Sequence, residues 1–195
     1  MPTSAPPRVT GLLLAAGAGR RMGMPKALVV TDGVPWVRRA ADVLLAGGCA
    51  DVVVVLGAAE QEARDALAGV GPRVAAVACP AWAEGMGESL RTGLAALRER
   101  SAGAALVHLV DLPDVGPAVV RRMLAAAAGP AALARAAYDG VPGHPVLLGA
   151  DHFAGVAALA AGDTGAREYL RRHRPAVVEC GDLAGGLDVD APPRP

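Results

Sequence analysis

Short apolar runs and amphipathic stretches alternate along most of the chain. The apolar runs predict strands at residues 9–14, 27–30, 51–56, 73–77, 104–110, 131–137 and 176–179, with another short strand inside a turn-rich segment at 138–148. The run at 51–56 is β-branched without polar alternation, which is typical of a strand buried on both faces. Helices are predicted at 36–46, 59–68, 87–99, 118–128 and 162–172. This alternation predicts an α/β, Rossmann-like fold with a mostly parallel central sheet.

The pattern gives no sign of a second domain. There is no internal repeat and no long linker, and 195 residues suit one α/β domain with a well-buried core. We therefore expect a single domain over residues 1–195, in which residues 1–8 form a disordered lead-in. The strand–helix pattern continues to residue 137 and then loosens, so we expect the second half of this domain to have a different role from the first.

Composition narrows the classes of function. Apolar residues make up 53% of the chain and aromatic residues only 3%, so Ala, Val and Leu must fill the core. The formal net charge of zero argues against bulk attraction to nucleic acid or to an anionic membrane. Three widely spaced cysteines imply neither a disulfide framework nor a zinc site. No apolar run approaches the roughly 18 residues that cross a bilayer, and no signal peptide is recognisable, so we expect a cytoplasmic protein.

A glycine-rich loop with three cations follows the first predicted strand. In an open parallel sheet, ligands bind beyond the carboxyl ends of the strands, which is where this loop lies. Glycines let the backbone approach phosphate oxygens and direct N–H groups at them, and basic side chains add positive charge. A triphosphate requires both features. The glycines are Gly17, Gly19 and Gly23, and the basic residues are Arg20, Arg21 and Lys26.

Two familiar phosphate-binding loops do not fit these residues. The dinucleotide fingerprint requires glycine where Met22 stands, and the strand ending at Gly57 has no acidic ribose partner after it. The Walker A loop requires lysine between glycine and serine or threonine, whereas Lys26 lies between Pro25 and Ala27. The alternative to a phosphate loop is a flexible glycine turn with solvated arginines.

An aspartate follows the strand predicted at 104–110. Asp111 would point into the same crevice and is suited to hold Mg²⁺, since this ion takes one or two protein carboxylates and completes its shell with phosphate oxygens and water. Pro113 stiffens the turn behind it. We assign Asp111 to metal binding and Asp114, three residues before Pro117, to the N-cap of the next helix.

Six short motifs occur in a fixed order along the chain. They are Gly-x-Gly-x-Arg-Met-Gly and Pro-Lys within residues 14–26, Gly-Met-x-x-Ser-Leu at 85–90, Asp-x-Pro at 111–113, an approximate Gly-x-Pro-Gly-His-Pro at 139–145, Gly-Asp-x-Gly-Ala-Arg at 162–167, and Asp-Val-Asp at 188–190. Together they resemble the MobA-like nucleotidyltransferases, which have a glycosyltransferase-A-like fold, and among them the molybdenum cofactor cytidylyltransferase branch. The Thr-Pro-Glu-Asp that usually follows Asp-Val-Asp in this family is replaced by residues 191–195.

The resemblance implies a role for each motif. Residues 9–115 would bind the donor nucleotide and residues 116–190 the acceptor. The nucleotide-binding residues would be Leu14, Ala15, Ala16, Gly17, Gly19, Arg20, Arg21, Met22, Gly23, Lys26, Gly85 and Ser89. Lys26, Arg20 and Asp111 would be catalytic, and Mg²⁺ would bind Asp111 and Asp190, with Asp188 as a further candidate.

Three residues of the second half are candidates for acceptor binding, namely His144, Asp163 and Arg167. For His144 and Asp163 the alternative to acceptor binding is a purely structural role. A lone histidine is more often structural, Asp163 suits a helix N-cap, and Arg167 suits bidentate binding of a phosphate. In the donor half, Ser89 is equally well explained as a first-turn helix residue.

We therefore expect a Mg²⁺-dependent enzyme that transfers a nucleoside monophosphate to a phosphorylated small molecule and releases pyrophosphate. Ala16, where guanylyl-transferring relatives tend to carry glycine, favours CTP as donor. The molybdenum cofactor branch implies molybdopterin as acceptor and a molybdenum enzyme or its maturation factor as partner. A sugar phosphate, a polyol phosphate or a phospholactate-type acid would require the same donor site.

Two other functions are open to the same fold. One is oxidoreduction of a small aromatic compound, as in nicotine blue oxidoreductase, which the missing dinucleotide fingerprint disfavours. The other is a non-catalytic nucleotide-binding partner of a molybdenum enzyme, which the presence of both Asp111 and Lys26 disfavours.

Overall fold

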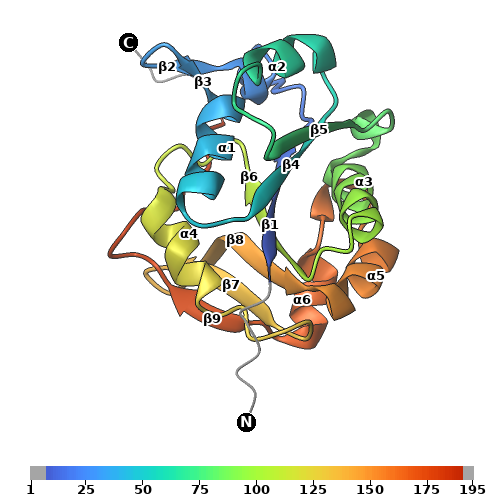
Figure 1. The fold of residues 1–195 in the computed structure, drawn as a ribbon, viewed down its shortest axis with the longest axis vertical. Helices are drawn as coiled ribbons and strands as arrows, with labels where there is room; N and C mark the ends of the chain where they lie inside the picture. Colours follow the sequence, from blue (N-terminus) through green and yellow to red (C-terminus); the bar gives the residue numbers. More distant parts are fainter. Residues whose placement is uncertain (1–7, 191–195) are drawn as a thin grey trace.

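The computed structural model describes residues 8–190, and a seven-stranded sheet runs through it (Figure 1). The strands are β1 (Val9–Ala15), β4 (Asp51–Leu56), β5 (Val74–Ala78), β6 (Ala104–Leu109), β7 (Leu133–Tyr138), β8 (Val141–Gly149) and β9 (Ala176–Glu179). Their order in the sheet is β5-β4-β1-β6-β8-β7-β9. All neighbours are parallel except that β8 is antiparallel to both β6 and β7. The predicted α/β fold with a mostly parallel sheet is confirmed.

Helices cover both faces of this sheet (Figure 1). One face packs against α1 (Trp36–Ala46) and α4 (Pro117–Leu124), and the other against α3 (Met86–Glu99), α5 (Ala150–Leu159) and α6 (Arg167–His173). Helix α2 (Glu60–Ala66) packs beside α1. Each face has its own cluster of buried apolar side chains. Within residues 8–190, no helix is both long enough and apolar enough to span a membrane.

Small residues bring the helices close to the sheet and to one another. A β-carbon on Gly93 of α3 would lie 2.5 Å from the Leu12 side chain of β1. One on Gly47, just after α1, would lie 2.3 Å from Val120 of α4. Larger residues at these points would force the elements apart, since protein interiors are close-packed. The core therefore fills with Ala, Val and Leu, as the composition predicts.

The region after the glycine-rich loop differs from the prediction. Instead of a strand at 27–30, a 3₁₀ turn, η1 (Lys26–Leu28), leads into a small separate hairpin of β2 (Val30–Thr31) and β3 (Val34–Pro35). The apolar residues of this segment suggested a sheet strand, but Ala27 is buried against the core as part of a turn. The turn places Lys26 at the carboxyl edge of the main sheet.

The second half departs further from the predicted pattern. The segment at 138–148 holds a nine-residue strand, β8, rather than a short one, and α5 was not predicted. Helix α5 is apolar on most sides, so it has no polar face to produce a helical period. The helix expected at 162–172 is divided into a 3₁₀ turn, η3 (Gly162–Thr164), and α6, and α4 ends at Leu124 rather than at residue 128.

The predicted lead-in lies almost entirely outside the described residues. Residues 1–7 are not described, nor are residues 191–195, where the sequence departs from the family pattern. Arg8, the last residue of the predicted lead-in, pairs with Asp51 at the start of β4 at 3.1 Å.

Candidate active site

A cleft of about 570 Å³ lies across the carboxyl ends of the central strands. It is open at the edge where the glycine-rich loop follows β1 and where Asp111 follows β6. Ligands of open α/β sheets bind at this edge. Thirteen of the predicted site residues line it, namely Leu14, Ala16, Gly17, Gly19, Arg20, Arg21, Lys26, Gly85, Ser89, Asp111, Asp163, Asp188 and Asp190.

The backbone of the glycine-rich loop is shaped for a ligand. Gly19 has a φ of 59°, and a β-carbon there would lie 2.0 Å from the carbonyl oxygen of Met24, so only glycine fits. Arg20 and Arg21 are exposed on the cleft wall. The other three predicted loop residues do not line the cleft: Ala15 and Met22 are buried in the core, and Gly23 faces open space.

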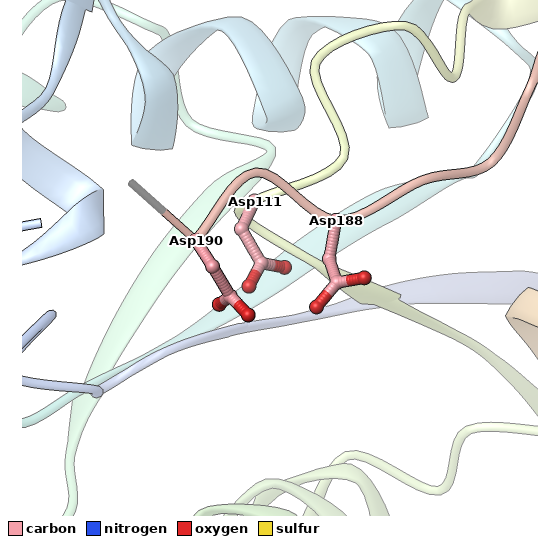
Figure 2. Close-up of side chains that lie close together, drawn as sticks. All are labelled: Asp111, Asp188 and Asp190. Atoms are coloured by element: carbon pink, nitrogen blue, oxygen red, sulfur yellow. The ribbon is translucent and has the colours of Figure 1, made fainter. Parts of the chain in front are cut away.

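Three aspartates meet beside this loop (Figure 2). Asp111, Asp188 and Asp190 each offer a carboxylate oxygen, and these atoms lie within 4.8 Å of one another. The backbone N–H of Val189 donates to the carbonyl oxygen of Asp111 at 2.9 Å, which brings the two segments together. The Oδ1 atom of Asp111 is buried and has no hydrogen-bond partner among the described residues. Clustered carboxylates with a free buried oxygen fit a divalent cation such as Mg²⁺.

Lys26 lies between two of these carboxylates. Its Nζ donates to Asp111 Oδ2 and to Asp190 Oδ1, both at 2.7 Å. Burial acts to lower the pKa of Lys26, but the hydrogen bonds to Asp111 and Asp190 outweigh it and raise that pKa above its usual value. The hydrogen bond from Lys26 also lowers the pKa of Asp190. Lys26 is therefore a fixed cation, shared between the two aspartates.

Asp190 also pairs with the guanidinium of Arg21 at 2.8 Å. Two cations from the glycine-rich loop thus hold one carboxylate from the far end of the chain. Arg20 lines the same cleft but has no ion pair among the described residues. Of the two arginines of this loop, Arg20 is thus the one whose charge is not paired with a carboxylate in the described part of the chain.

The aspartates at 188 and 190 are carried by a segment without regular structure, residues 180–190, called here the C-terminal segment. The carboxylate of Asp114 accepts hydrogen bonds from the N–H groups of Gly185 at 2.8 Å and Gly186 at 2.9 Å. The prediction that Asp114 caps the following helix is therefore wrong, because Gly116 occupies the N-cap of α4 without any side-chain cap. Asp114 is instead an anchor for this segment, a role that only the fold reveals.

The opposite wall of the cleft is formed by the start of α3 and by η3. Ser89 is buried on the first turns of α3, and Gly85 before it has a φ of 119°. A β-carbon on Gly85 would lie 2.4 Å from the backbone of Gly162, so glycine allows α3 and η3 to touch. Asp163 lies in η3 on the cleft wall, and the N-cap of α6 is Ala166, which corrects the expectation that Asp163 caps that helix.

Two acceptor-site candidates lie outside the cleft wall. His144 is half-buried in β8, and its carbonyl oxygen accepts a hydrogen bond from the Tyr138 hydroxyl at 2.6 Å. Burial, with the charge of Arg135, lowers the pKa of His144 to about 4, so its ring is neutral at pH 7. Arg167 is exposed at the start of α6. The structure thus brings Asp163 to the cleft but neither His144 nor Arg167.

The cleft is also lined by residues to which no role was assigned from the sequence, although one of them, Met86, lies in the motif at 85–90. The largest of these side chains are Trp82, in a 3₁₀ turn η2 (Trp82–Glu84), and Met86 at the start of α3. A signal for Trp82 was present, because it follows the strand predicted at 73–77 and so falls at the carboxyl edge of the sheet. Trp82, Ala83 and Met86 add apolar surface to the lining after β5, whereas Lys26 follows β1 and Asp111 follows β6.

Comparison with known proteins identifies the family. Residues 11–177 match the MobA-like NTP transferase domain. The chain belongs to this family. The match confirms the resemblance inferred from the six motifs, and it covers both the glycine-rich loop and the strand that leads to Asp111.

Individual relatives carry different activities in their names. Nicotine blue oxidoreductase of Paenarthrobacter nicotinovorans is 40% identical over 94% of this chain and 93% of its own. Molybdenum cofactor guanylyltransferase of Rhodobacter capsulatus is 30% identical over 75% of this chain and 66% of its own. Among solved structures, Rv0371c of Mycobacterium tuberculosis is 30% identical with a TM-score of 0.76, over 96% of this chain and 95% of that one. It has also been solved in complex with manganese, at 31% identity and a TM-score of 0.68 over 88% and 86%.

Proposed function

We propose that this protein transfers a nucleoside monophosphate, CMP from CTP, to a phosphorylated small-molecule acceptor and releases pyrophosphate. The observation that carries the proposal is that Lys26 hydrogen-bonds both Asp111 and Asp190 beside the glycine-rich loop. A cleft whose lining offers both apolar surface and basic side chains suits a nucleoside triphosphate, which has a flat base and a polyanionic tail. Membership of a nucleotidyltransferase family supports it.

In this proposal the loop binds the donor's phosphates. Gly17 and Gly19 present backbone N–H groups, and Arg20, Arg21 and Lys26 supply positive charge. The acceptor's phosphate oxygen attacks the α-phosphorus of the donor, the α–β bridging bond breaks, and pyrophosphate leaves. No residue forms a covalent intermediate. The chain contributes by positioning the reactants and by stabilising charge on the departing phosphates.

Asp111 and Asp190 would hold Mg²⁺, with Asp188 as a further ligand. Three carboxylates with oxygens within 4.8 Å and an unpartnered buried oxygen on Asp111 fit such an ion. Bound Mg²⁺ would neutralise part of the negative charge on the triphosphate. The manganese complex of Rv0371c supports a divalent ion in a relative. Lys26 uses two of its three N–H donors on the aspartates, which leaves one donor for a phosphate oxygen of the bound nucleotide.

The acceptor we favour is molybdopterin or its molybdenum form. The name of the Rhodobacter capsulatus relative supports it, and Ala16 supports CTP over GTP. In this proposal residues 9–115 bind the donor and residues 116–190 the acceptor within one cytoplasmic domain, and a molybdenum enzyme or its maturation factor is the partner. Asp163, His144 and Arg167 are the proposed acceptor residues, of which Asp163 already faces the cleft.

Oxidoreduction of a small aromatic compound is the second candidate. The observation that favours it is the 40% identity to nicotine blue oxidoreductase over 94% of this chain. Such a reaction needs an electron carrier, and a bound flavin would give the purified protein absorbance at flavin wavelengths. A colourless protein that gains no such absorbance on incubation with flavin, and that turns over CTP, would contradict this candidate.

Pyrophosphate release tests the proposal directly. The purified protein is incubated with Mg²⁺ and CTP, GTP or ATP, with molybdopterin or its molybdenum form as acceptor. We expect release with CTP that requires the pterin and is lost in Asp111→Ala. Triphosphate binding without release from any of the three would direct the search to other phosphorylated acceptors. No triphosphate binding at all would overturn the proposal.

A further inference from the structure

The aromatic residues of this chain are few, and one of them is placed differently from the rest. The sequence holds two tryptophans, two tyrosines and one phenylalanine, all within the described part of the chain. Trp36, Tyr138, Tyr169 and Phe153 are buried, at 6% exposure or less. Trp82 alone among them is only half-buried, and it lines the cleft. Core packing therefore accounts fully for four of the aromatic side chains, whereas Trp82 packs only partly against the core and leaves the rest of its side chain on the cleft wall.

The position of Trp82 is fixed by its backbone and by a glycine. Its N–H donates to the carbonyl oxygen of Cys79 at 3.1 Å, and its own carbonyl accepts from the N–H of Gly85 at 3.2 Å. A β-carbon on Gly57, after β4, would lie 2.5 Å from the Cβ and Cγ atoms of Trp82. The base of the indole is thus seated directly on the end of β4, where only glycine leaves room. This seat pre-organises the ring on the cleft wall.

The sheet order sets how far Trp82 lies from the charged groups. Trp82 follows β5, the glycine-rich loop follows β1, and Asp111 follows β6. Across the sheet these strands run in the order β5-β4-β1-β6. A ligand whose phosphates lie on the loop, with Asp111 on one side, therefore has its other end on the side of Trp82. That end of the cleft is also lined by Ala83 and by Met86, which is 37% exposed.

We propose that Trp82 stacks on the nucleobase of the bound triphosphate and so positions the donor. This inference rests on the proposed function and adds the residue that binds the base. Stacking is tolerant of base identity because every base has a π-face. Trp82 would therefore contribute affinity for any nucleoside triphosphate, while the choice of base would be made by hydrogen bonds and fit elsewhere, including at Ala16. Trp82 makes no contact with the reacting phosphates, so it is a positioning residue.

Binding measurements on matched variants test the role of Trp82. Calorimetric titration with CTP and Mg²⁺ is compared with titration by inorganic tripolyphosphate, which has the same charged tail and no base. We expect Trp82→Ala to weaken CTP binding by about ten- to a hundredfold, the usual range for loss of one base–aromatic stack, and Trp82→Phe to restore most of it. Tripolyphosphate should bind all three proteins within about twofold, because it reaches only the charged end.

Fluorescence gives a second reading that does not depend on how well Trp82→Ala folds. In Trp36→Phe, Trp82 is the sole tryptophan, and its emission should be quenched by CTP but not by tripolyphosphate. The matched variant Trp82→Phe keeps Trp36, which is 5% exposed and donates its indole N–H to Thr31 at 2.9 Å. Its emission should change little with either ligand. Equal quenching of Trp36 and Trp82 by CTP would indicate a general effect and overturn the inference.

Other outcomes separate this inference from the proposed function. Unchanged CTP affinity in Trp82→Ala, or equal losses for CTP and tripolyphosphate, would overturn the stacking role and leave the proposed function intact. CTP that binds and quenches Trp82 but yields no pyrophosphate with any acceptor would support the stacking role and count against nucleotidyl transfer. A wild-type protein that binds neither ligand would overturn both.

Discussion

The two sides of the aspartate cluster are built in different ways. The first side, called here the strand wall, consists of β1 with its glycine-rich loop and β6 with Asp111. Both strands lie in the middle of the sheet and pair on each edge, and their side chains are almost all buried. The second side is the C-terminal segment, residues 180–190, which has no helix or strand and in which only Cys180 is buried.

Hydrogen bonds and ion pairs, together with the burial of Cys180 and the packing of Ala184 and Val189 on the core, hold the C-terminal segment in place. Arg122 pairs with Asp182, Asp114 accepts from Gly185 and Gly186, and the backbone of Val189 bonds Asp111. The last of its aspartates is held by Lys26 and Arg21 of the glycine-rich loop. Exposed polar contacts of this kind contribute little stability each, so the segment should open more easily than the strand wall. A site assembled from both sides combines a rigid carboxylate with two detachable ones.

The largest effect should come from the rigid carboxylate. Asp111→Ala removes an aspartate that accepts a hydrogen bond from Lys26 and is the first of the proposed metal ligands. We expect pyrophosphate release to fall at least a hundredfold, because the metal and the position of Lys26 are lost together. Asp42→Ala on the exposed side of α1 is the control and should behave as wild type. Activity of Asp111→Ala within tenfold of wild type would contradict the assigned role.

Lys26→Ala should have the next largest effect, because it removes the link between the two sides of the site. By analogy with the loss of one preorganised charge-stabilising donor, we expect a rate loss of about a hundredfold, equivalent to about 3 kcal/mol. In the absence of nucleotide, the affinity for Mn²⁺ should not fall in this variant. Asp111 and Asp190 are then no longer paired with the ammonium of Lys26, which competes with the metal for their oxygens. The control is Arg98→Ala, which removes a positive charge from an exposed position near the end of α3 and should leave the rate unchanged. Wild-type turnover at saturating triphosphate would refute the role of Lys26.

Acid should weaken the strand wall through His108, a buried residue of β6. Its ring is 1% exposed, and its Nδ1 has no hydrogen-bond partner among the described residues. Burial, aided by the charge of His144, lowers the pKa of His108 from 6.5 to about 3. Between those pH values only the unfolded chain binds this proton, so the free energy of unfolding falls as the pH drops below 6.5. The loss should be on the order of 3 kcal/mol by pH 4.

The variant His108→Leu removes that titration and the unpartnered nitrogen with it. Urea unfolding at pH 7, 5.5 and 4.5 should show a smaller decline of stability for this variant than for wild type. His173→Gln, exposed at the end of α6, serves as the control for loss of a histidine. Equal declines for His108→Leu and wild type would mean that His108 is not the source of the acid sensitivity.

A smaller effect is expected from loosening the C-terminal segment alone. Asp114→Ala removes the acceptor for two backbone N–H groups and should lower Mn²⁺ affinity by about tenfold, as loss of a residue behind metal ligands commonly does. Because Asp114 is exposed, the midpoint of thermal unfolding should hardly change. Asp114→Asn keeps a side-chain oxygen and should retain most of the affinity. A large loss of thermal stability without any change in Mn²⁺ affinity would indicate that the two sides are not independent.

The same division describes how far the sequence can be interpreted without the structure. In the first half, uniform apolar runs are a local property, and the predicted helix and strand at Trp36–Ala46 and Asp51–Leu56 are observed with those bounds. In the second half, β8 and α5 were misjudged because their burial comes from antiparallel pairing with β6 and from packing on α3, which local periodicity does not encode. The glycine-rich loop and Asp111 were found because each follows a recognisable strand.

The sequence by itself thus determined the fold class, the phosphate-loop candidate and the identity of the three aspartates. Only the tertiary structure decided that Asp114 anchors the C-terminal segment rather than capping a helix, that Lys26 lies between Asp111 and Asp190, and that Trp82 faces the cleft. The reason is physical. Strand and turn propensities act between near neighbours, whereas these contacts join residues up to 164 positions apart, and the position of such partners depends on how the whole sheet is ordered.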